Sequence, residues 1–126
     1  MNLVDSSAWL EFFADGPNAE HFAKPISTTL ELIVPTICLY EVFKRVLQQV
    51  SESDALQAAA IMQQGHIVDL DDSLSLSAAK ISADNKLPMA DSIILATARQ
   101  FNAIVWTQDA DFARFDNVQY FEKQTG

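Results

Sequence analysis

The chain has 126 residues, of which 49% are hydrophobic and 20% are charged, a balance typical of a folded protein with one core. Seventeen acidic residues against eight basic ones give a net charge of −9, which argues against a broadly basic nucleic-acid-binding surface. One cysteine excludes a disulfide framework, no apolar run reaches transmembrane length, and the N-terminus lacks the pattern of a secretory signal. We therefore expect a single domain over residues 1–126, located in the cytoplasm and without a membrane segment.

The first half of the chain alternates short apolar runs with segments of helical spacing. The predicted elements are a strand over 3–4, a helix from residue 6 to the turn at 15–17, a helix over about 17–22, a strand over 30–34 and a helix over about 36–50. Pro35 ends the second strand, because proline cannot continue the hydrogen-bond ladder inside a sheet.

The second half continues the same alternation. It contains a helix from residue 51 or 53 to about 64, a strand over 66–70, a helix over about 73–84, a helix over 89–101, a strand over 103–107, a loop or short helix over 108–112 and an edge strand over 118–121. Strands that alternate with helices predict an α/β fold, here a three-layer α/β/α sandwich with a mainly parallel central sheet.

Asp91 lies on the apolar stripe of the helix that follows Pro88. Residues three, four and seven positions further along are Ile94, Leu95 and Ala98, which places the carboxylate on the core side. Burying an ionised carboxylate among apolar neighbours is costly, and a helix N-terminus offsets only about 0.3–1 kcal/mol of that cost. A cation would offset more, so other acids that could share one are of interest.

Three further acids lie where the predicted topology brings chain segments together. Asp5 ends the first strand, Asp109 lies two residues past the fourth strand, and Glu41 lies in the first turns of its helix. In a parallel α/β sheet, the positions just after the strands meet at one edge. Oxygen ligands without histidine or cysteine favour a hard cation, Mg²⁺ or Mn²⁺.

Each of these acids also has a purely structural explanation. Asp5 can cap a helix, Asp91 can be an acid in the first turn that the helix dipole stabilises, and Asp109 can stabilise a turn. Glu41 can pair with Arg45 four residues on, which is worth about 0.2–0.5 kcal/mol. The metal-site prediction rests on all four acids occurring together, in the right order and in the right elements.

Four motifs carry a resemblance to a known family. They are residues 3–7 (LVDSS), 40–42 (YEV), 88–98 (PMADSIILATA) and 107–112 (TQDADF). With these motifs, the chain resembles PIN domains and, among them, VapC-type toxins of type II toxin–antitoxin pairs. The resemblance covers essentially the whole chain, and every acid of the family pattern is present.

The resemblance implies a metal-dependent endoribonuclease that hydrolyses RNA phosphodiester bonds with Mg²⁺-activated water, with Mn²⁺ as a substitute. The implied catalytic and metal-site acids are Asp5, Glu41, Asp91 and Asp109, with Asp5 and Asp91 as direct ligands. The implied supporting residues are Ser7, Thr107 and Asp111. Candidate contacts to RNA phosphates are Lys44, Arg45, Lys86 and Arg99, although each can equally be a solvated charge on a helix face or in a loop. The resemblance further implies a cognate antitoxin protein and a homodimer.

Two other function classes are considered for an acidic α/β domain. The first is a module that binds a protein and cuts nothing, and metal binding would distinguish it from the nuclease. The second is a phospho-receiver domain, which requires paired acids after the first strand and a lysine after the last. Here Asp5 is followed by two serines, and residues 106–108 contain no lysine. Only three glycines are present, which excludes a glycine-rich phosphate loop.

Overall fold

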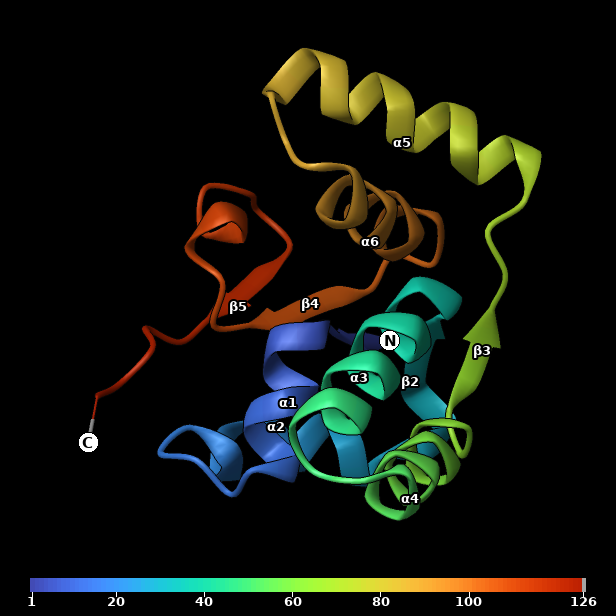
Figure 1. The fold of residues 1–126 in the computed structure, drawn as a ribbon. Helices are drawn as coiled ribbons and strands as arrows, with labels where there is room; N and C mark the ends of the chain where they lie inside the picture. Colours follow the sequence, from blue (N-terminus) through green and yellow to red (C-terminus); the bar gives the residue numbers. More distant parts are fainter. Residues whose placement is uncertain (126) are drawn as a thin grey trace.

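A computed structural model describes residues 1–125, and its centre is a five-stranded sheet of order β3-β2-β1-β4-β5 (Figure 1). The strands are β1 (Asn2–Val4), β2 (Leu32–Pro35), β3 (His66–Val68), β4 (Ile104–Thr107) and β5 (Val118–Tyr120). All four pairs of neighbouring strands are parallel, including the edge strand β5. Asn2 of β1 pairs with Leu32 on one side and with Ile104 on the other, so β1 is the central strand.

Helices fill the connections between the strands. They are α1 (Ser6–Phe13), α2 (Ala19–Ser27), α3 (Thr36–Gln49), α4 (Glu52–Met62), α5 (Asp72–Asn85) and α6 (Met89–Gln100), with short 3₁₀ turns η1 (Thr29–Glu31) and η2 (Ala110–Phe112). In Figure 1, α5 and α6 lie above β4 and β5, and the other helices lie below them. The predicted three-layer α/β/α fold with a parallel sheet is therefore confirmed.

Two predicted boundaries in the first half of the chain are wrong. Helix α2 continues to Ser27 instead of ending near residue 22, because Phe22, Pro25 and Ile26 all lie buried on one face of a longer helix. Strand β2 begins at Leu32 instead of residue 30. Leu30 lies in η1 with 94% of its surface exposed, so it cannot belong to a buried strand.

Helix α6 is the most deeply buried helix and fixes the position of Asp91. Every residue over 92–98 is buried, with Thr97 satisfied by donating to the carbonyl oxygen of Ile93 at 2.8 Å. Fully burying an isoleucine or leucine contributes about 1.5–3 kcal/mol each. Because the core holds α6 over these residues, Asp91 in its first turn has a well-defined position. Among residues 1–125, no helix has both the length and the apolar character needed to cross a membrane.

Candidate functional site

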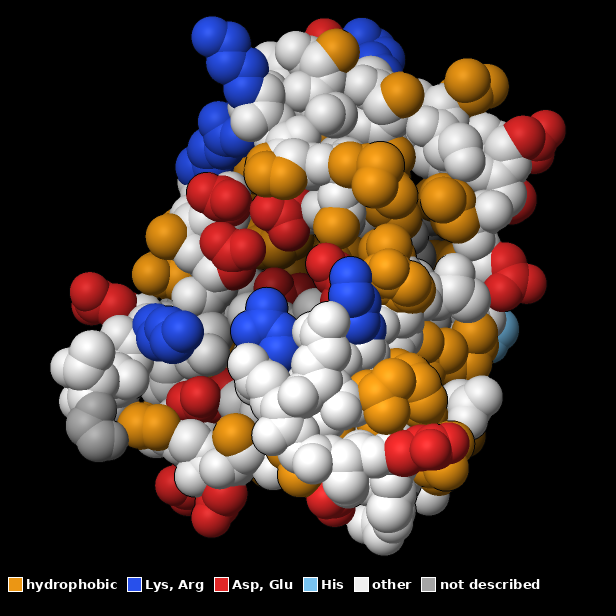
Figure 2. Space-filling model, in the orientation of Figure 1, with side chains coloured by type: hydrophobic (Ala, Val, Ile, Leu, Met, Phe, Trp, Pro, Cys, Tyr) orange, Lys and Arg blue, Asp and Glu red, His pale blue; other side chains and the backbone are white. Residues whose placement is uncertain are grey.

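Five acids converge at the edge of the sheet where β1 and β4 end. Asp5 follows β1 directly, Asp109 lies two residues past β4, and Asp111 is part of η2. Asp91 lies in the first turn of α6, and Glu41 lies in the second turn of α3. Figure 2 shows Asp and Glu side chains gathered in a hollow on this face, with Lys and Arg side chains along its borders.

Asp91, Asp109 and Asp111 form the tightest group. One carboxylate oxygen from each residue lies within 4.8 Å of the others, a grouping that can hold a divalent cation. The sequence predicts Asp111 only as a residue that supports the metal-site acids, but in the structure its carboxylate is a member of this group. Asp5 and Glu41 lie next to the group and outside it.

Asp5 is held by hydrogen bonds from three directions. Asp5 is only 2% exposed, and its carboxylate accepts from Ser7 Oγ (2.8 Å to Oδ1 and 3.1 Å to Oδ2), from Thr107 Oγ1 at 2.7 Å and from the backbone N–H of Ala8 at 3.0 Å. A carboxylate offers about four lone-pair positions, and these contacts involve three donor protons because Ser7 has only one to share between the two oxygens, so about one position remains available. Asp5 therefore caps α1 and can still offer an oxygen to a cation.

The loop after β4 is tied to the start of α1 by the same hydroxyl groups. Thr107 Oγ1 accepts a hydrogen bond from the backbone N–H of Asp109 at 2.9 Å, and Ser7 Oγ accepts one from the backbone N–H of Gln108 at 3.3 Å. Asp109 in turn accepts from the backbone N–H of Asp111 at 2.9 Å. These bonds set the spacing of the acids that follow β4 against Asp5.

Glu41 is positioned by Ser6, whose Oγ donates to Glu41 Oε1 at 2.7 Å. The alternative ion pair with Arg45 does not form, and the one ion pair within residues 1–125 joins Lys80 to Asp84. Sequence reasoning missed Ser6. The available signal was its place beside Asp5 in a pair of serines at the start of a helix.

Asn18 is a second residue that the sequence did not single out. It is 1% exposed, and its side-chain nitrogen donates to Gln108 Oε1 and to the backbone oxygen of Glu122, both at 3.0 Å. Asn18 thereby holds the residue before Asp109 against the C-terminal segment. In the sequence it reads only as a turn residue before a helix, so no local signal could have found it.

Burial and mutual repulsion raise the pKa values of two of the acids. Burial is the main reason that the pKa of Asp91 rises to about 7, and the charges of Asp109, Asp111, Asp5 and Glu41 add to the rise. Burial also raises the pKa of Asp5 to about 6, although its three hydrogen bonds favour the ionised form. A cation in this hollow would favour the ionised carboxylates and so reverse both effects.

The donor set fits a hard divalent cation. All the acids offer carboxylate oxygens, the ligands that Mg²⁺ and Mn²⁺ prefer. The histidines have other contacts, since His21 stacks on Phe121 at 4.3 Å between ring centroids and His66 packs edge-on against Phe101 at 5.8 Å. The chemistry of the residues thus agrees with the type of ion that the sequence suggested.

The candidate phosphate contacts lie at different distances from the acids. Arg45 lines a groove of about 560 Å³ together with Ser7, and Lys86 lines a hollow of about 630 Å³ together with Asp111. Lys44 lies over the ring of Tyr40, with its Nζ 5.6 Å from the centroid. Arg99 lies at the opposite end of α6 from Asp91, about 12 Å away along the helix axis.

Comparison with known proteins adds family and fold relationships. The family described as PIN domain matches residues 3–118. A toxin–antitoxin complex from Klebsiella pneumoniae has a TM-score of 0.82 at 20% identity, covering 98% of this chain and 100% of that one. VapC20 of Mycobacterium tuberculosis, described as a sarcin-ricin loop cleaving toxin, has a TM-score of 0.77 at 18% identity, covering 94% and 99%.

A third solved structure, DNA-bound VapBC from Salmonella typhimurium, has a TM-score of 0.71 at 15% identity, covering 97% of this chain and 98% of that one. The search of curated proteins returned no match. At these identities, the likeness to solved structures establishes a shared fold.

Proposed function

Because this chain belongs to the PIN-domain family, we propose that it is a metal-dependent endoribonuclease and the toxin component of a type II toxin–antitoxin pair. The observation that carries the proposal is the group of Asp91, Asp109 and Asp111, with Asp5 and Glu41 beside it. Within residues 1–125 none of these five acids forms an ion pair with a basic side chain. The structural neighbours described as a toxin and as toxin–antitoxin complexes support the same assignment.

We assign the ion to the oxygens of Asp91, Asp109 and Asp111, with Asp5 able to contribute its remaining lone pair. Bound Mg²⁺, or Mn²⁺ in its place, supplies positive charge against the scissile phosphate and lowers the pKa of water at the site. Without that charge the acids would repel the RNA backbone. Ion binding and substrate binding are therefore expected to be coupled.

The protein side chains orient the reacting groups. Ser7 and Thr107 keep the carboxylate of Asp5 in one orientation through their hydrogen bonds. Ser6 holds one oxygen of Glu41, which leaves Oε2 without a donor among residues 1–125 and able to accept from water at the site. Glu41 is therefore our candidate for orienting the attacking water.

The proposal includes an antitoxin and a second copy of the chain. The groove of about 560 Å³ between α1, α3 and α4 combines apolar residues such as Leu10, Phe13 and Ile61 with Arg45 and Lys123, and it suits a segment of a partner protein. The toxin–antitoxin complexes among the structural neighbours support such a partner. We extend the proposal to a homodimer that acts in the cytoplasm, where its RNA substrate would be found.

The decisive test is cleavage of a pool of structured RNAs by the purified protein with Mg²⁺, with Mn²⁺ and with EDTA. Asp91→Asn is the test variant, and Asp69→Asn is the matched control because Asp69 is an exposed acid outside the site. We expect cleavage that requires metal, is lost in Asp91→Asn and is kept in Asp69→Asn. A folded protein that cuts no RNA and gains no thermal stability from Mg²⁺ would instead support the acidic protein-binding module.

A further inference from the structure

Two neighbouring hollows lead from the acidic group toward the far end of α6. The nearer hollow, about 630 Å³, is lined by Asp111, Lys86 and Arg114 among others. The farther hollow, about 280 Å³, is lined by Arg114, Arg99 and Phe115 among others. Arg114 lines both hollows and Asp111 belongs to the three-acid group, so the surface is continuous from the acids to Arg99.

Arg99 and Arg114 share one aromatic ring. Their guanidinium carbons lie 5.7 Å and 4.9 Å from the centroid of Phe115, and such contacts hold a guanidinium plane in place. Neither arginine forms an ion pair within residues 1–125, although Asp116 also lines the farther hollow. Two like charges at one ring repel each other, and an anion bound between them would relieve this. The planar guanidinium group is well suited to a phosphate.

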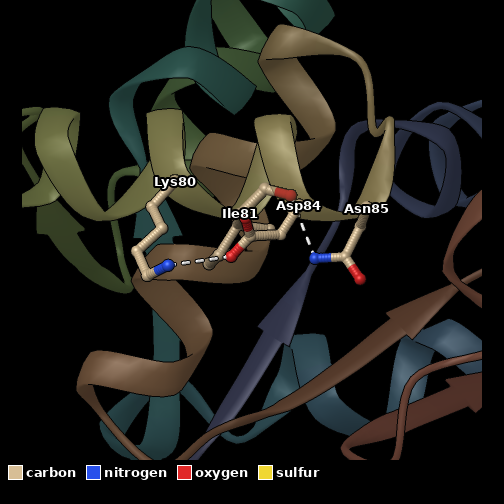
Figure 3. A network of polar contacts seen from close by, with 4 residues as sticks. All are labelled: Lys80, Ile81, Asp84 and Asn85. Atoms are coloured by element: carbon tan, nitrogen blue, oxygen red, sulfur yellow. Dashed lines mark hydrogen bonds and ion pairs between the residues drawn. The ribbon is translucent and has the colours of Figure 1, made fainter.

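The end of α5 holds Arg114 in place through one hydrogen bond and leaves the other N–H donors of Arg114 available. Figure 3 shows Asn85 donating from its side chain to the carbonyl oxygen of Ile81, and Lys80 paired with Asp84. The carbonyl oxygen of Asn85 in turn accepts a hydrogen bond from Arg114 Nη2 at 2.7 Å. A guanidinium group has five N–H donors, so most of those on Arg114 remain available for a ligand.

The distribution of basic residues points in the same direction. The chain carries eight Lys and Arg residues in total, and three of them, Lys86, Arg99 and Arg114, line these two hollows. An RNA strand that reaches a site rich in carboxylates needs cations along its path to hold its phosphates. Concentrating scarce basic residues beside the acids provides such a path.

We propose that the hollow formed by Arg99, Phe115 and Arg114 binds a backbone phosphate of the RNA strand, away from the scissile bond. Lys86 lies beside the strand between this subsite and the acids. Because Arg99 is about 12 Å along the helix axis from Asp91, the phosphate it holds is not the one that is cut. This inference rests on the proposed function, since it names a substrate subsite of the same nuclease.

The test measures RNA binding without cleavage. In an Asp91→Asn background, the affinity for a fluorescently labelled single-stranded oligouridylate is followed by anisotropy over a series of salt concentrations with Mg²⁺ present. The slope of log K against log salt is negative. We expect Arg99→Gln and Arg114→Gln each to make it less steep by about 0.7, the value for one lost phosphate contact on a single strand. Lys24→Gln, which removes an exposed charge from the end of α2, is the matched control and should keep the slope.

A third variant separates charge from geometry. Arg114→Lys keeps the positive charge but loses the planar fork and most of the contact with Phe115, so weaker binding with an unchanged slope is expected. If Arg114→Gln unfolds because the end of α5 loses its partner, Arg99→Gln decides alone, since Arg99 donates no side-chain hydrogen bond within the described residues. Melting curves identify that case.

The outcomes distinguish this subsite from the proposed function. If the unmodified protein cuts RNA while both arginine variants, in the Asp91→Asn background, bind RNA with the same affinity and salt dependence as the Lys24→Gln control, the subsite is wrong and the nuclease stands. If the unmodified protein cuts no RNA, the proposed function fails, and the binding series still decides the subsite because it needs no cleavage. Absence of any RNA binding at low salt would overturn the subsite as well.

Discussion

Asp5 and Asp71 perform the same local task in two different surroundings. Each residue is an N-cap, Asp5 accepting from the backbone N–H of Ala8 at 3.0 Å and Asp71 from that of Leu74 at 2.8 Å. Asp71 lies on the surface, whereas Asp5 is buried and also accepts hydrogen bonds from the hydroxyl groups of Ser7 and Thr107. The cap itself is therefore no sign of function. Burial and donors from a distant strand turn one of two similar aspartates into part of a site.

The largest expected difference between the two caps is in catalysis. Asp5→Asn keeps an oxygen to cap α1 but removes the charge, and we expect RNA cleavage to fall by about a hundredfold or more, at the upper end of the effect of removing a group that orients a metal site. Asp71→Asn should cleave at the rate of the unmodified protein. Initial rates at saturating Mg²⁺ measure this. Equal rates for both variants would show that Asp5 is only a structural cap.

A second difference concerns pH and stability in the absence of metal. The pKa of Asp5 is raised to about 6 and that of Asp91 to about 7, so between pH 4 and pH 7 the folded state binds more protons than the unfolded state. Stability must then fall as the pH rises through this range and level off above it. We expect the EDTA-treated protein to be about 2 kcal/mol less stable at pH 8 than at pH 5, after discounting the partly exposed Asp91.

Chemical denaturation at the two pH values measures this loss, and Mg²⁺ should remove most of it by stabilising the ionised acids. In Asp91→Asn the loss of stability on raising the pH should be smaller. A metal-free protein that is more stable at pH 8 than at pH 5 would contradict the assignment of buried acids to the site.

A third comparison removes one hydroxyl group near each cap. Thr107→Val deletes the donor to Asp5 and the acceptor for the N–H of Asp109, so we expect the affinity for Mg²⁺ to fall about tenfold. Ser75→Ala is the counterpart at Asp71, where the hydroxyl donates only to the backbone oxygen, and it should leave the affinity unchanged. Isothermal titration with Mg²⁺ measures both. Equal affinities in the two variants would mean that Thr107 plays no part in the site.

The smallest effect is expected at the surface cap itself. Asp71→Ala leaves the N–H of Leu74 without its acceptor and should destabilise the protein by about 1 kcal/mol. The stabilisation gained from Mg²⁺ should stay the same, because Asp71 is outside the acidic group. Denaturation curves with and without Mg²⁺ report both quantities. A loss of the Mg²⁺ effect in this variant would show that the two regions are coupled.

The sequence was informative where the physics is local or repetitive. Apolar periodicity predicted the order of strands and helices, and the topology it implied placed Asp5, Asp91 and Asp109 at one edge of the sheet. The contacts that set their spacing depend on tertiary packing. Thr107 and Asp5 are 102 residues apart, a separation that no local sequence pattern can detect.

The same reason accounts for what the sequence missed. The sequence named Asp111 only as a supporting residue, because its place in the three-acid group depends on how η2 lies against α6. Ser6 reaches Glu41 across 35 residues, and Asn18 reaches Gln108 across 90. The pairing of Arg99 with Arg114 over Phe115 likewise needs the folded chain.

The central position of β1 has a consequence for how the protein folds during synthesis on the ribosome. Asp5 directly follows strand β1, but the neighbouring strand β4 begins only at residue 104, and Asp109 and Asp111 come after it. A growing chain therefore carries Asp5 and Glu41 before Asp109 and Asp111 have been made. The acidic centre can assemble only after β4 and η2 have left the ribosome, so a nascent chain that has not yet reached η2 has no assembled site.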